Sequence, residues 1–196
     1  MPRKLKGKDL ITIGIFSAIY FVINFIFMLL GGIHPVLWVM MPGLIALFTG
    51  VPYMILASKV QKPGAVLIMG IITGLIYYVT GMFTVVILIS FASACVLAEI
   101  VRLIAKYKSF AGNTVSFAIF SVGMIGSPLP LWLFKDSFFT QISEQGMSAD
   151  YLSILSNLAT DWMLVIMILA PVVLGGVGAL IAKGLFKKHF VKAGIV

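Results

Sequence analysis

Six apolar runs, separated by short polar connections, account for most of this chain. A bilayer core about 30 Å thick is crossed by a helix of roughly 20 mostly apolar residues. The runs that meet this requirement, or come close to it, are residues 10–30, 36–58, 65–80, 83–105, 114–134 and 161–186. The third run is short and the fourth follows it through Gly81, which predicts a tight helical hairpin. The sequence therefore predicts an all-α integral membrane protein, in which residues 1–196 form a single domain of six transmembrane helices.

The composition agrees with lipid, rather than water, as the solvent. Apolar residues make up 61% of the 196 residues and charged residues 10%, whereas a soluble domain has about 45–50% and about 25%. One core of this size could not hide so large an apolar excess. These values exclude a secreted disulfide scaffold, a soluble enzyme and a disordered tail. The single cysteine, Cys95, lies within an apolar run, so neither a disulfide nor redox chemistry is expected.

The lysines and arginines are distributed asymmetrically about the six predicted helices. If the amino terminus is cytoplasmic, all fourteen except Lys135 fall on the cytoplasmic side. This is the positive-inside pattern, and it predicts that both termini are cytoplasmic. The acidic residues Asp136, Glu144, Asp150 and Asp161 lie in or beside the last external loop. The net charge of +8 is therefore explained by topology, and no nucleic-acid partner is expected.

The sequence contains no motif of catalytic, metal or nucleotide chemistry. It lacks a P-loop, an H-E-x-x-H and a G-x-S-x-G motif, and His34 and His189 are too few for a metal cluster. Glu99 and Arg102 are the charged residues expected within the membrane. Their spacing favours an i,i+3 pair, with the arginine reaching toward the headgroups, over a proton relay. We therefore expect no enzyme, no metal, no cofactor and no ion-coupled transporter.

Polar and aromatic residues concentrate at the outer ends of the predicted helices. Residues 127–130, Ser-Pro-Leu-Pro, break the fifth helix, and irregular backbone at membrane depth is tolerated where it is buried or lines a cavity. Side chains at this depth could stack on a flat heteroaromatic ligand and bond its edges. The candidate binding residues are Asn24, His34, Trp38, Tyr77, Thr84, Trp132 and Asp161. For the aromatic ones, a belt at the membrane interface is the alternative interpretation.

The external segment 135–160 is the only long polar connection. Ser148 could cap a short helix in it. The residues that would share one face of this helix are Tyr151, Ile154, Leu155 and Leu158. An interfacial helix or lid and an ordinary solvated loop are both compatible with this pattern.

Small residues recur at a spacing of four in the predicted helices, a pattern that lets helix backbones approach closely in lipid. The pairs are Gly14/Ala18, Gly70/Gly74, Ala94/Ala98 and Gly175/Ala179. We expect the last three pairs to pack within the bundle. Gly14 and Ala18 lie near the cytoplasmic half of the first helix, where they could contact a partner protein.

Residues 4–20, KLKGKDLITIGIFSAIY, resemble the opening of the Trep_Strep family of bacterial integral membrane proteins. Those proteins are similar to S components, the substrate-capturing subunits of energy-coupling factor (ECF) transporters for vitamins. Size, helix number and the cytoplasmic termini agree over essentially the whole chain. Gly14-x-x-x-Ala18 aligns with the A-x-x-x-A motif by which S components dock onto their transport partner. Glycine replaces the first alanine, and the motif requires only that both residues be small.

The resemblance implies an S-component-like bundle in the bacterial plasma membrane. Its partners would be a transmembrane T component and two ABC ATPases, which would supply the energy that this chain has no motif to capture. The ligand site would lie in the outer half, beneath a loop formed by residues 30–35, with Gly31 and Gly32 as a mobile gate. The expected substrate is a small vitamin-like molecule of the hydroxymethylpyrimidine or pyridoxine type.

Two alternatives remain open. A small membrane enzyme would need an acid–base pair, for which Asp161 and His34 are the only candidates. A self-contained small-solute carrier would need a polar stripe that reaches the inner side, and residues 86–98 show none.

Overall fold

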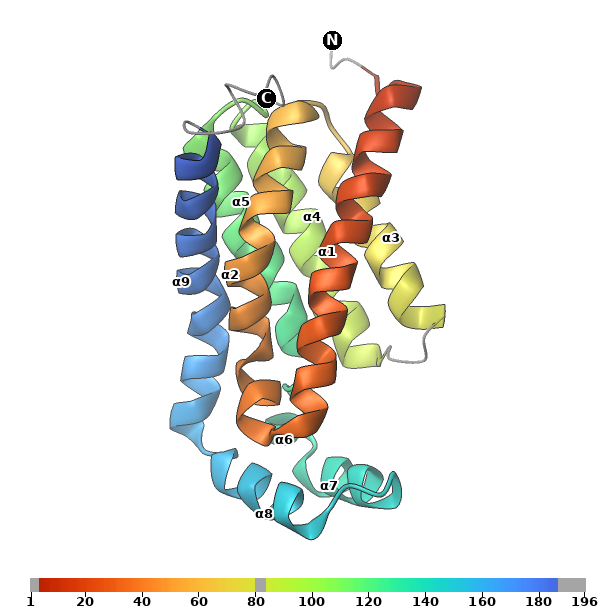
Figure 1. Cartoon of the computed structure of the whole chain (residues 1–196), viewed down its shortest axis with the longest axis vertical. Coiled ribbons are helices and arrows are strands. Elements are labelled where there is room, and N and C mark those ends of the chain that lie inside the picture. The colour runs from red at the N-terminus through yellow and green to blue at the C-terminus, as the bar shows by residue number, and fades with distance from the viewer. Residues whose placement is uncertain (1–3, 80–83, 187–196) are drawn as a thin grey trace.

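The structure is a computed structural model that describes residues 4–79 and 84–186, and every regular element in these ranges is helical (Figure 1). The elements are α1 (Gly7–Ile33), α2 (Pro35–Lys59), α3 (Ala65–Val79), α4 (Val85–Ile104), α5 (Phe110–Val122), the 3-10 helix η1 (Gly123–Gly126), α6 (Pro130–Leu133), α7 (Lys135–Glu144), α8 (Ala149–Leu158) and α9 (Asp161–Leu185).

Helix α2 occupies the centre of the bundle. It packs most extensively against α9, then against α1, and on a further side against α5. Helix α4 pairs with α5 and η1, and α3 lies between α1 and α4. The short helices α6, α7 and α8 lie together at the end of the bundle opposite the start of α1 (Figure 1). The long helices therefore form a scaffold that carries the short ones at one end.

Four helices, α1, α2, α4 and α9, are long and apolar enough to cross a membrane. Two shorter apolar segments accompany them, α3 and residues 110–126. The chain is therefore a multi-pass integral membrane protein, and the six-span count stays a prediction. The turn predicted at Gly81 lies outside the described residues.

The predicted fifth helix, residues 114–134, differs from the structure at both ends. Ser109 caps α5 by accepting a bond from the Gly112 amide at 3.1 Å, so the helix begins at Phe110. The helix then tightens into η1 at Gly123, before the predicted break at residues 127–130. A Cβ on Gly123 would lie 2.8 Å from a Phe91 ring carbon, so glycine is required where η1 crosses α4. The break was predicted, but it starts earlier because of this close crossing.

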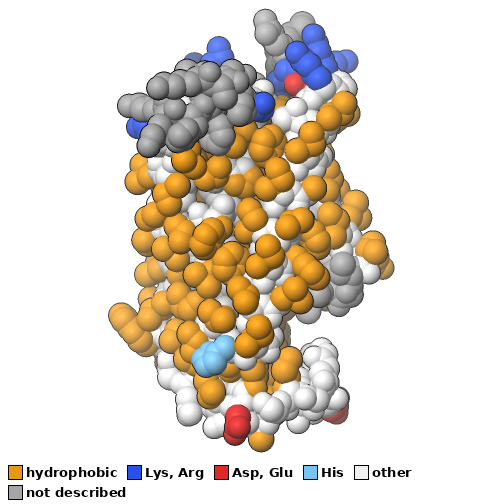
Figure 2. All heavy atoms as spheres, viewed as in Figure 1, with side chains coloured by type: hydrophobic (Ala, Val, Ile, Leu, Met, Phe, Trp, Pro, Cys, Tyr) orange, Lys and Arg blue, Asp and Glu red, His pale blue; other side chains and the backbone are white. Residues whose placement is uncertain are grey.

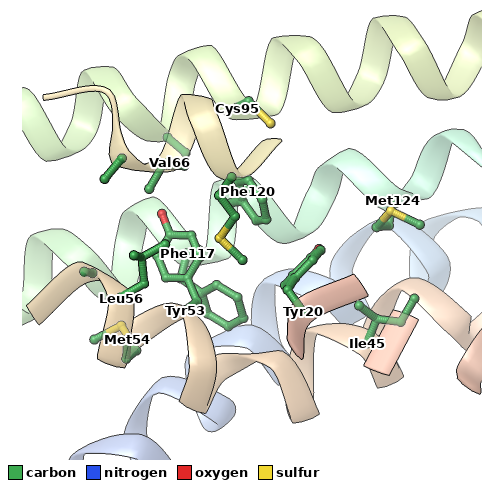
Figure 3. Close-up of a cluster of buried hydrophobic side chains, with 14 of the residues drawn as sticks. Tyr20, Ile45, Tyr53, Met54, Leu56, Val66, Cys95, Phe117, Phe120 and Met124 are labelled. Carbon is green, nitrogen blue, oxygen red and sulfur yellow. The ribbon is translucent and has the colours of Figure 1, made fainter. Parts of the chain in front are cut away.

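The core of the bundle is built from aromatic side chains and small residues. The Tyr53 ring lies 4.7 Å from Phe117 and 5.2 Å from Phe120, centroid to centroid (Figure 3). Helices α2 and α9 approach backbone to backbone, since a Cβ on Gly50 would lie 2.4 Å from the carbonyl carbon of Gly178. Close contact of this kind increases the van der Waals attraction between the helices, which matters in lipid because burying apolar side chains drives little helix association there.

The predicted small-residue pairs separate as expected. The residues buried within the bundle are Gly70, Ala94, Ala98, Gly175 and Ala179. Gly14 is half-buried, with nothing within 4 Å of where its Cβ would be, and Ala18 is exposed. The internal packing is thus confirmed for Ala94/Ala98, Gly175/Ala179 and Gly70, whereas Gly74 is half-buried and lines the hollow between α3 and α4. The Gly14/Ala18 face is left uncovered.

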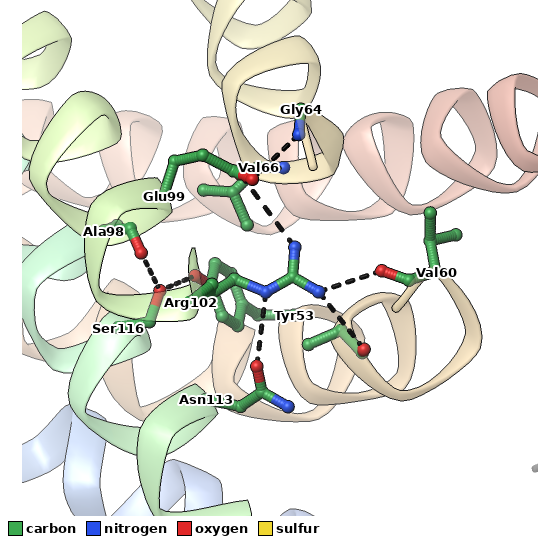
Figure 4. A network of polar contacts seen from close by, with 10 residues as sticks. Tyr53, Val60, Gly64, Val66, Ala98, Glu99, Arg102, Asn113 and Ser116 are labelled. Atoms are coloured by element: carbon green, nitrogen blue, oxygen red, sulfur yellow. Dashed lines mark hydrogen bonds and ion pairs between the residues drawn. The ribbon is translucent and has the colours of Figure 1, made fainter. Parts of the chain in front are cut away.

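Arg102 is fully buried at the end of the bundle where α2 ends and α3 begins. One guanidinium nitrogen, Nη2, donates to the carbonyls of Ala57 at 3.3 Å and Val60 at 2.9 Å, and Nε donates to Asn113 Oδ1 at 3.2 Å (Figure 4). Arg102 Nη1 lies 4.0 Å from Glu99 Oε2. The guanidinium thus joins the last carbonyls of α2 to α4 and α5.

Glu99 completes the arrangement from the other side. Its carboxylate accepts bonds from the Gly64 and Val66 amides, at 2.8 and 3.1 Å, at the start of α3. A cation at the carboxyl end of α2 and an anion at the amino end of α3 both interact favourably with the helix dipoles. We refer to Glu99, Arg102, Asn113 and the backbone groups that they bind as the charged node. The i,i+3 pair was predicted, but the expectation that Arg102 reaches toward the headgroups is wrong, because three helices enclose its side chain.

Replacing Arg102 with methionine should strongly destabilise the bundle. The change leaves the α2 carbonyls without a donor and Glu99 without its cation, and breaking a buried ion pair costs about 3–5 kcal/mol. The thermal unfolding midpoint in detergent should fall by on the order of 10 °C. Lys108→Met, at an exposed position in the following turn, is the matched control and should change the midpoint little. Equal midpoints for the two variants would contradict the role given to the charged node.

The predicted topology can be tested with cysteine accessibility in intact cells. In a Cys95→Ala background, an impermeant thiol reagent should modify Glu144→Cys, in α7, and spare Gln61→Cys, between α2 and α3. Both positions are exposed, so the difference reports sidedness. Modification at position 61 in sealed cells would refute cytoplasmic termini with six spans.

Candidate functional site

A cavity of about 510 Å³ opens at the end of the bundle that carries α6, α7 and α8. We call it the α7 cavity. The long helices contribute Met28 and Gly32 from α1, Trp38 from α2, and the first turn of α4. The opposite walls come from α7 and from Tyr151 and Leu155 of α8. The polar side chains of the described lining are all uncharged: Thr84, Ser127, Ser137, Gln141, Gln145 and Tyr151.

Helix α7 directs one face into this cavity. Its lining residues recur at helical spacing: Phe134, Ser137, Phe138, Gln141, Ile142 and Gln145. No residue of α7 is fully buried, although Phe138, Phe139 and Ile142 pack against the small core cluster at this end of the bundle. Its principal ring contact is with α2, where the Phe138 ring stacks on Trp38 at 5.4 Å with an interplanar angle of 16°. Helix α7 and the residues at its two ends thus contribute two aromatic rings and two primary amides to the cavity lining.

Helix α8 anchors this cover to the bundle. Ser148 caps the helix by accepting a bond from the Tyr151 amide at 3.2 Å, and Leu155 is buried in a cluster with residues from the first turns of α2 and α9. The Tyr151 hydroxyl donates to the Gly31 carbonyl at 2.8 Å. Burial raises the pKa of Tyr151, so the hydroxyl stays protonated and able to donate. The short capped helix is confirmed, although Ile154 is exposed rather than packed.

Two of the predicted binding residues, Trp38 and Thr84, line the α7 cavity. The Thr84 hydroxyl also accepts a bond from the Ile87 amide at 3.3 Å, which begins α4 at the cavity wall. Both line the cavity because Trp38 lies in the first turn of α2 and Thr84 immediately precedes α4, at the end of the bundle where the cavity opens.

Asn24 and Tyr77 are both buried, and they are not part of the lining. The Asn24 amide donates to the Tyr20 carbonyl at 2.7 Å and accepts from the Tyr77 hydroxyl at 3.1 Å. This contact joins α1 to α3. Asn24 lies one helical turn from Met28, on the face of α1 that continues into the cavity wall.

The other three predicted residues hold helix ends together or face outward. His34 Nδ1 accepts from the Val36 amide at 3.2 Å and caps α2. Trp132 Nε1 donates to the Thr160 carbonyl at 3.0 Å, which joins α6 to the start of α9. Asp161 is the exposed first residue of α9. The structure thus brings none of these three into the α7 cavity.

The loop expected at residues 30–35 is not present. Helix α1 continues through Ile33, and His34 alone separates it from α2. Gly31 is buried, and a Cβ there would lie 3.2 Å from three atoms of Trp38. Gly31 therefore permits close packing and offers its carbonyl to Tyr151, whereas Gly32 lines the cavity. The glycines were expected to give the chain mobility here. Instead, Gly31 allows α1 to pack closely against α2 and the Trp38 ring.

Sequence reasoning missed the residues of α7. The pattern in residues 134–145 was available, because two aromatic side chains, Phe134 and Phe138, are followed by two amides, Gln141 and Gln145, at spacings of three and four. It was treated as a polar connection, since polar residues in an external segment are usually assigned to water.

A second hollow, of about 840 Å³, lies between α3 and α4. It is lined almost entirely by apolar side chains from the lengths of both helices, among them Ile71, Leu75 and Leu88. These side chains are exposed at membrane depth, so the hollow is a lipid-facing groove, in which Tyr78 and Thr84 at one end carry the only hydroxyl groups of the described lining.

Removing the Tyr151 hydroxyl should loosen α8 without unfolding the bundle. Tyr151→Phe loses the bond to the Gly31 carbonyl, which is worth about 0.5–1.5 kcal/mol. Amide hydrogen exchange across α8 should rise by about two- to tenfold, while exchange in α2 and α9 stays unchanged. Thr140→Val, at an exposed position on α7, should have no such effect. Uniform exchange in the two variants would show that this bond does not anchor α8.

The comparisons with known proteins identify the family of the chain. A family model described as a hypothetical bacterial integral membrane protein, Trep_Strep, matches residues 7–192. Searches of curated proteins and of solved structures found no match. Since the family model covers nearly the whole chain, including every helix described above, the protein belongs to the Trep_Strep family of bacterial integral membrane proteins.

Proposed function

We propose that this protein is the S component of an ECF-type importer in the bacterial plasma membrane, and that the α7 cavity captures its substrate. The observation that carries the proposal is the cavity itself, an uncharged polar and aromatic space at one end of an otherwise apolar bundle. Such a space suits a small flat molecule with hydrogen-bonding edges. The family resemblance supports a vitamin-like substrate, of the hydroxymethylpyrimidine or pyridoxine type.

The charge distribution supports an outward-facing cavity. Lysine and arginine side chains gather at the end where α1 begins, and acidic side chains lie at the end with α7 and α8 (Figure 2). The middle of the bundle presents an apolar surface. By the positive-inside rule, the basic end faces the cytoplasm and the cavity faces the exterior.

Helix α7 is the element that we propose as the gate. It has no buried residue, and the turn to α8 passes through Gly146, whose φ of +85° favours glycine. Helix α8, in contrast, is held by Leu155 and Tyr151. Displacing α7 would uncover the cavity while α8 stays attached.

The exposed face of α1 supports docking onto a T component that is coupled to two ABC ATPases. Gly14 and Ala18 lie among exposed apolar side chains, with Ile11 and Ile15 more than half exposed. Two small residues on such a face leave a shallow furrow that another helix can enter closely.

Direct assembly tests the proposed function. Co-expression with a T component and two ATPases should yield a complex that copurifies with this chain, and mass spectrometry of the purified chain should reveal a bound small molecule. ATP-dependent uptake of that molecule should require all four proteins. A chain that recovers neither partners nor ligand would contradict the proposal.

A bulky residue on the α1 face should separate docking from binding. Ala18→Trp should abolish complex recovery and uptake, while the isolated subunit still binds the ligand with native affinity. Gly176→Trp, on α9 and also with open space around it, is the control and should assemble normally. Normal uptake by the Ala18 variant would exclude this face as the docking surface.

Substitutions in α7 should weaken ligand binding. Gln141→Leu removes an amide from the cavity and should lower affinity about tenfold, as expected for an unpaired ligand group. Thr140→Val, the neighbouring residue outside the lining, should not change affinity. Titration calorimetry with the identified ligand measures both, and equal affinities would place the site elsewhere.

A further inference from the structure

The α7 cavity separates charged from uncharged side chains. The charged residues at this end of the described chain are Lys135, Asp136, Glu144, Asp150 and Asp161, and each is exposed. None of them belongs to the lining. A ligand inside the cavity therefore meets amides, hydroxyls and rings, and no ionic partner.

Three acidic residues nevertheless lie directly beside lining residues in the chain. Asp136, Glu144 and Asp150 each adjoin a lining residue in the chain, namely Ser137, Gln145 and Tyr151. With Asp161, they set four carboxylates against the single ammonium of Lys135, which leaves a net charge of −3 at this end. We call these four carboxylates the acidic rim.

Both features act against an anionic ligand. The acidic rim repels an anion as it approaches, since clefts bordered by one sign of charge select the opposite sign. Inside the cavity, an anion loses part of its hydration and gains no cation in return. An uncharged ring pays neither cost. An organic cation is attracted by the rim and by the aromatic faces of Phe134 and Trp38.

We propose that the α7 cavity takes a planar organic molecule that carries no negative charge, and that it discriminates against phosphorylated or carboxylated counterparts. This inference rests on the proposed function, since it names the class of substrate that the S component captures. Gln141 and Gln145 would form hydrogen bonds with the polar edge of the ligand's ring, and the acidic rim would disfavour anionic ligands.

Charged thiol reagents test this selection without a known substrate. In a Cys95→Ala background, the purified full-length protein carries Ser137→Cys in the cavity. Its reaction rates are measured with a trimethylammonium-ethyl and a sulfonato-ethyl methanethiosulfonate, and each rate is divided by that of free cysteine. The cationic reagent should be favoured about three- to tenfold at low salt, and the preference should collapse at about 0.5 M salt. Gln141→Cys serves as a second reporter.

Two controls assign the preference to the acidic rim. The triple variant Asp136→Asn, Glu144→Gln, Asp150→Asn should lose most of it. Gln61→Cys, exposed at the basic end of the bundle, should favour the anionic reagent. Equal or faster reaction of the anionic reagent at both cavity positions would overturn the inference.

The ligand recovered from the purified chain provides a second readout. A molecule without phosphate or carboxylate groups supports the inference, and one that carries either group overturns it. Failure of the proposed function has a different signature. If no complex forms with a T component and ATPases while the reagent preference persists, the transport proposal is wrong and the charge selectivity of the cavity stands.

Discussion

The buried guanidinium of Arg102 is the interaction on which the arrangement of the helices most depends. Each helix end that lies inside a membrane protein leaves backbone groups that must find partners. Arg102 supplies donors to the end of α2, and Glu99 supplies acceptors to the start of α3. With these ends satisfied, α2 and α3 turn sharply at one end of the bundle, and the central position of α2 follows.

The opposite end of the bundle is built on different principles. There the helix ends are satisfied by local caps, His34 for α2, Thr84 for α4 and Thr160 for α9. Local caps leave side chains of neighbouring helices free to line a space, so the same end that lacks a charged node contains the cavity. The division of the molecule into a tightly connected end and an open end therefore begins with how helix termini are satisfied.

Much of the scaffold could be predicted from the sequence, because apolar length and capping residues act locally. The long helices and the Ser148 cap belong to this class, as do Trp38 and Thr84, whose positions at helix ends place them near the opening. Other features depend on distant partners. The burial of Arg102 requires α2 and α5, and Asn24 turns toward Tyr77 rather than the cavity because α3 lies beside it. The polar side chains of α7 face the cavity, whereas polar residues in an external segment are usually assigned to water. Residue type alone therefore does not predict that this helix lines a cavity.

The absence of buried residues in α7 has a consequence for how this protein can evolve. Residues that build a core are constrained by packing, and most changes there reduce stability. Gln141 and Gln145 face the cavity without this constraint, because both are exposed, whereas Phe138 and Ile142 pack against the cluster around Leu131. A lineage can therefore exchange these amides, and with them the chemistry of the cavity wall, while the membrane scaffold stays the same.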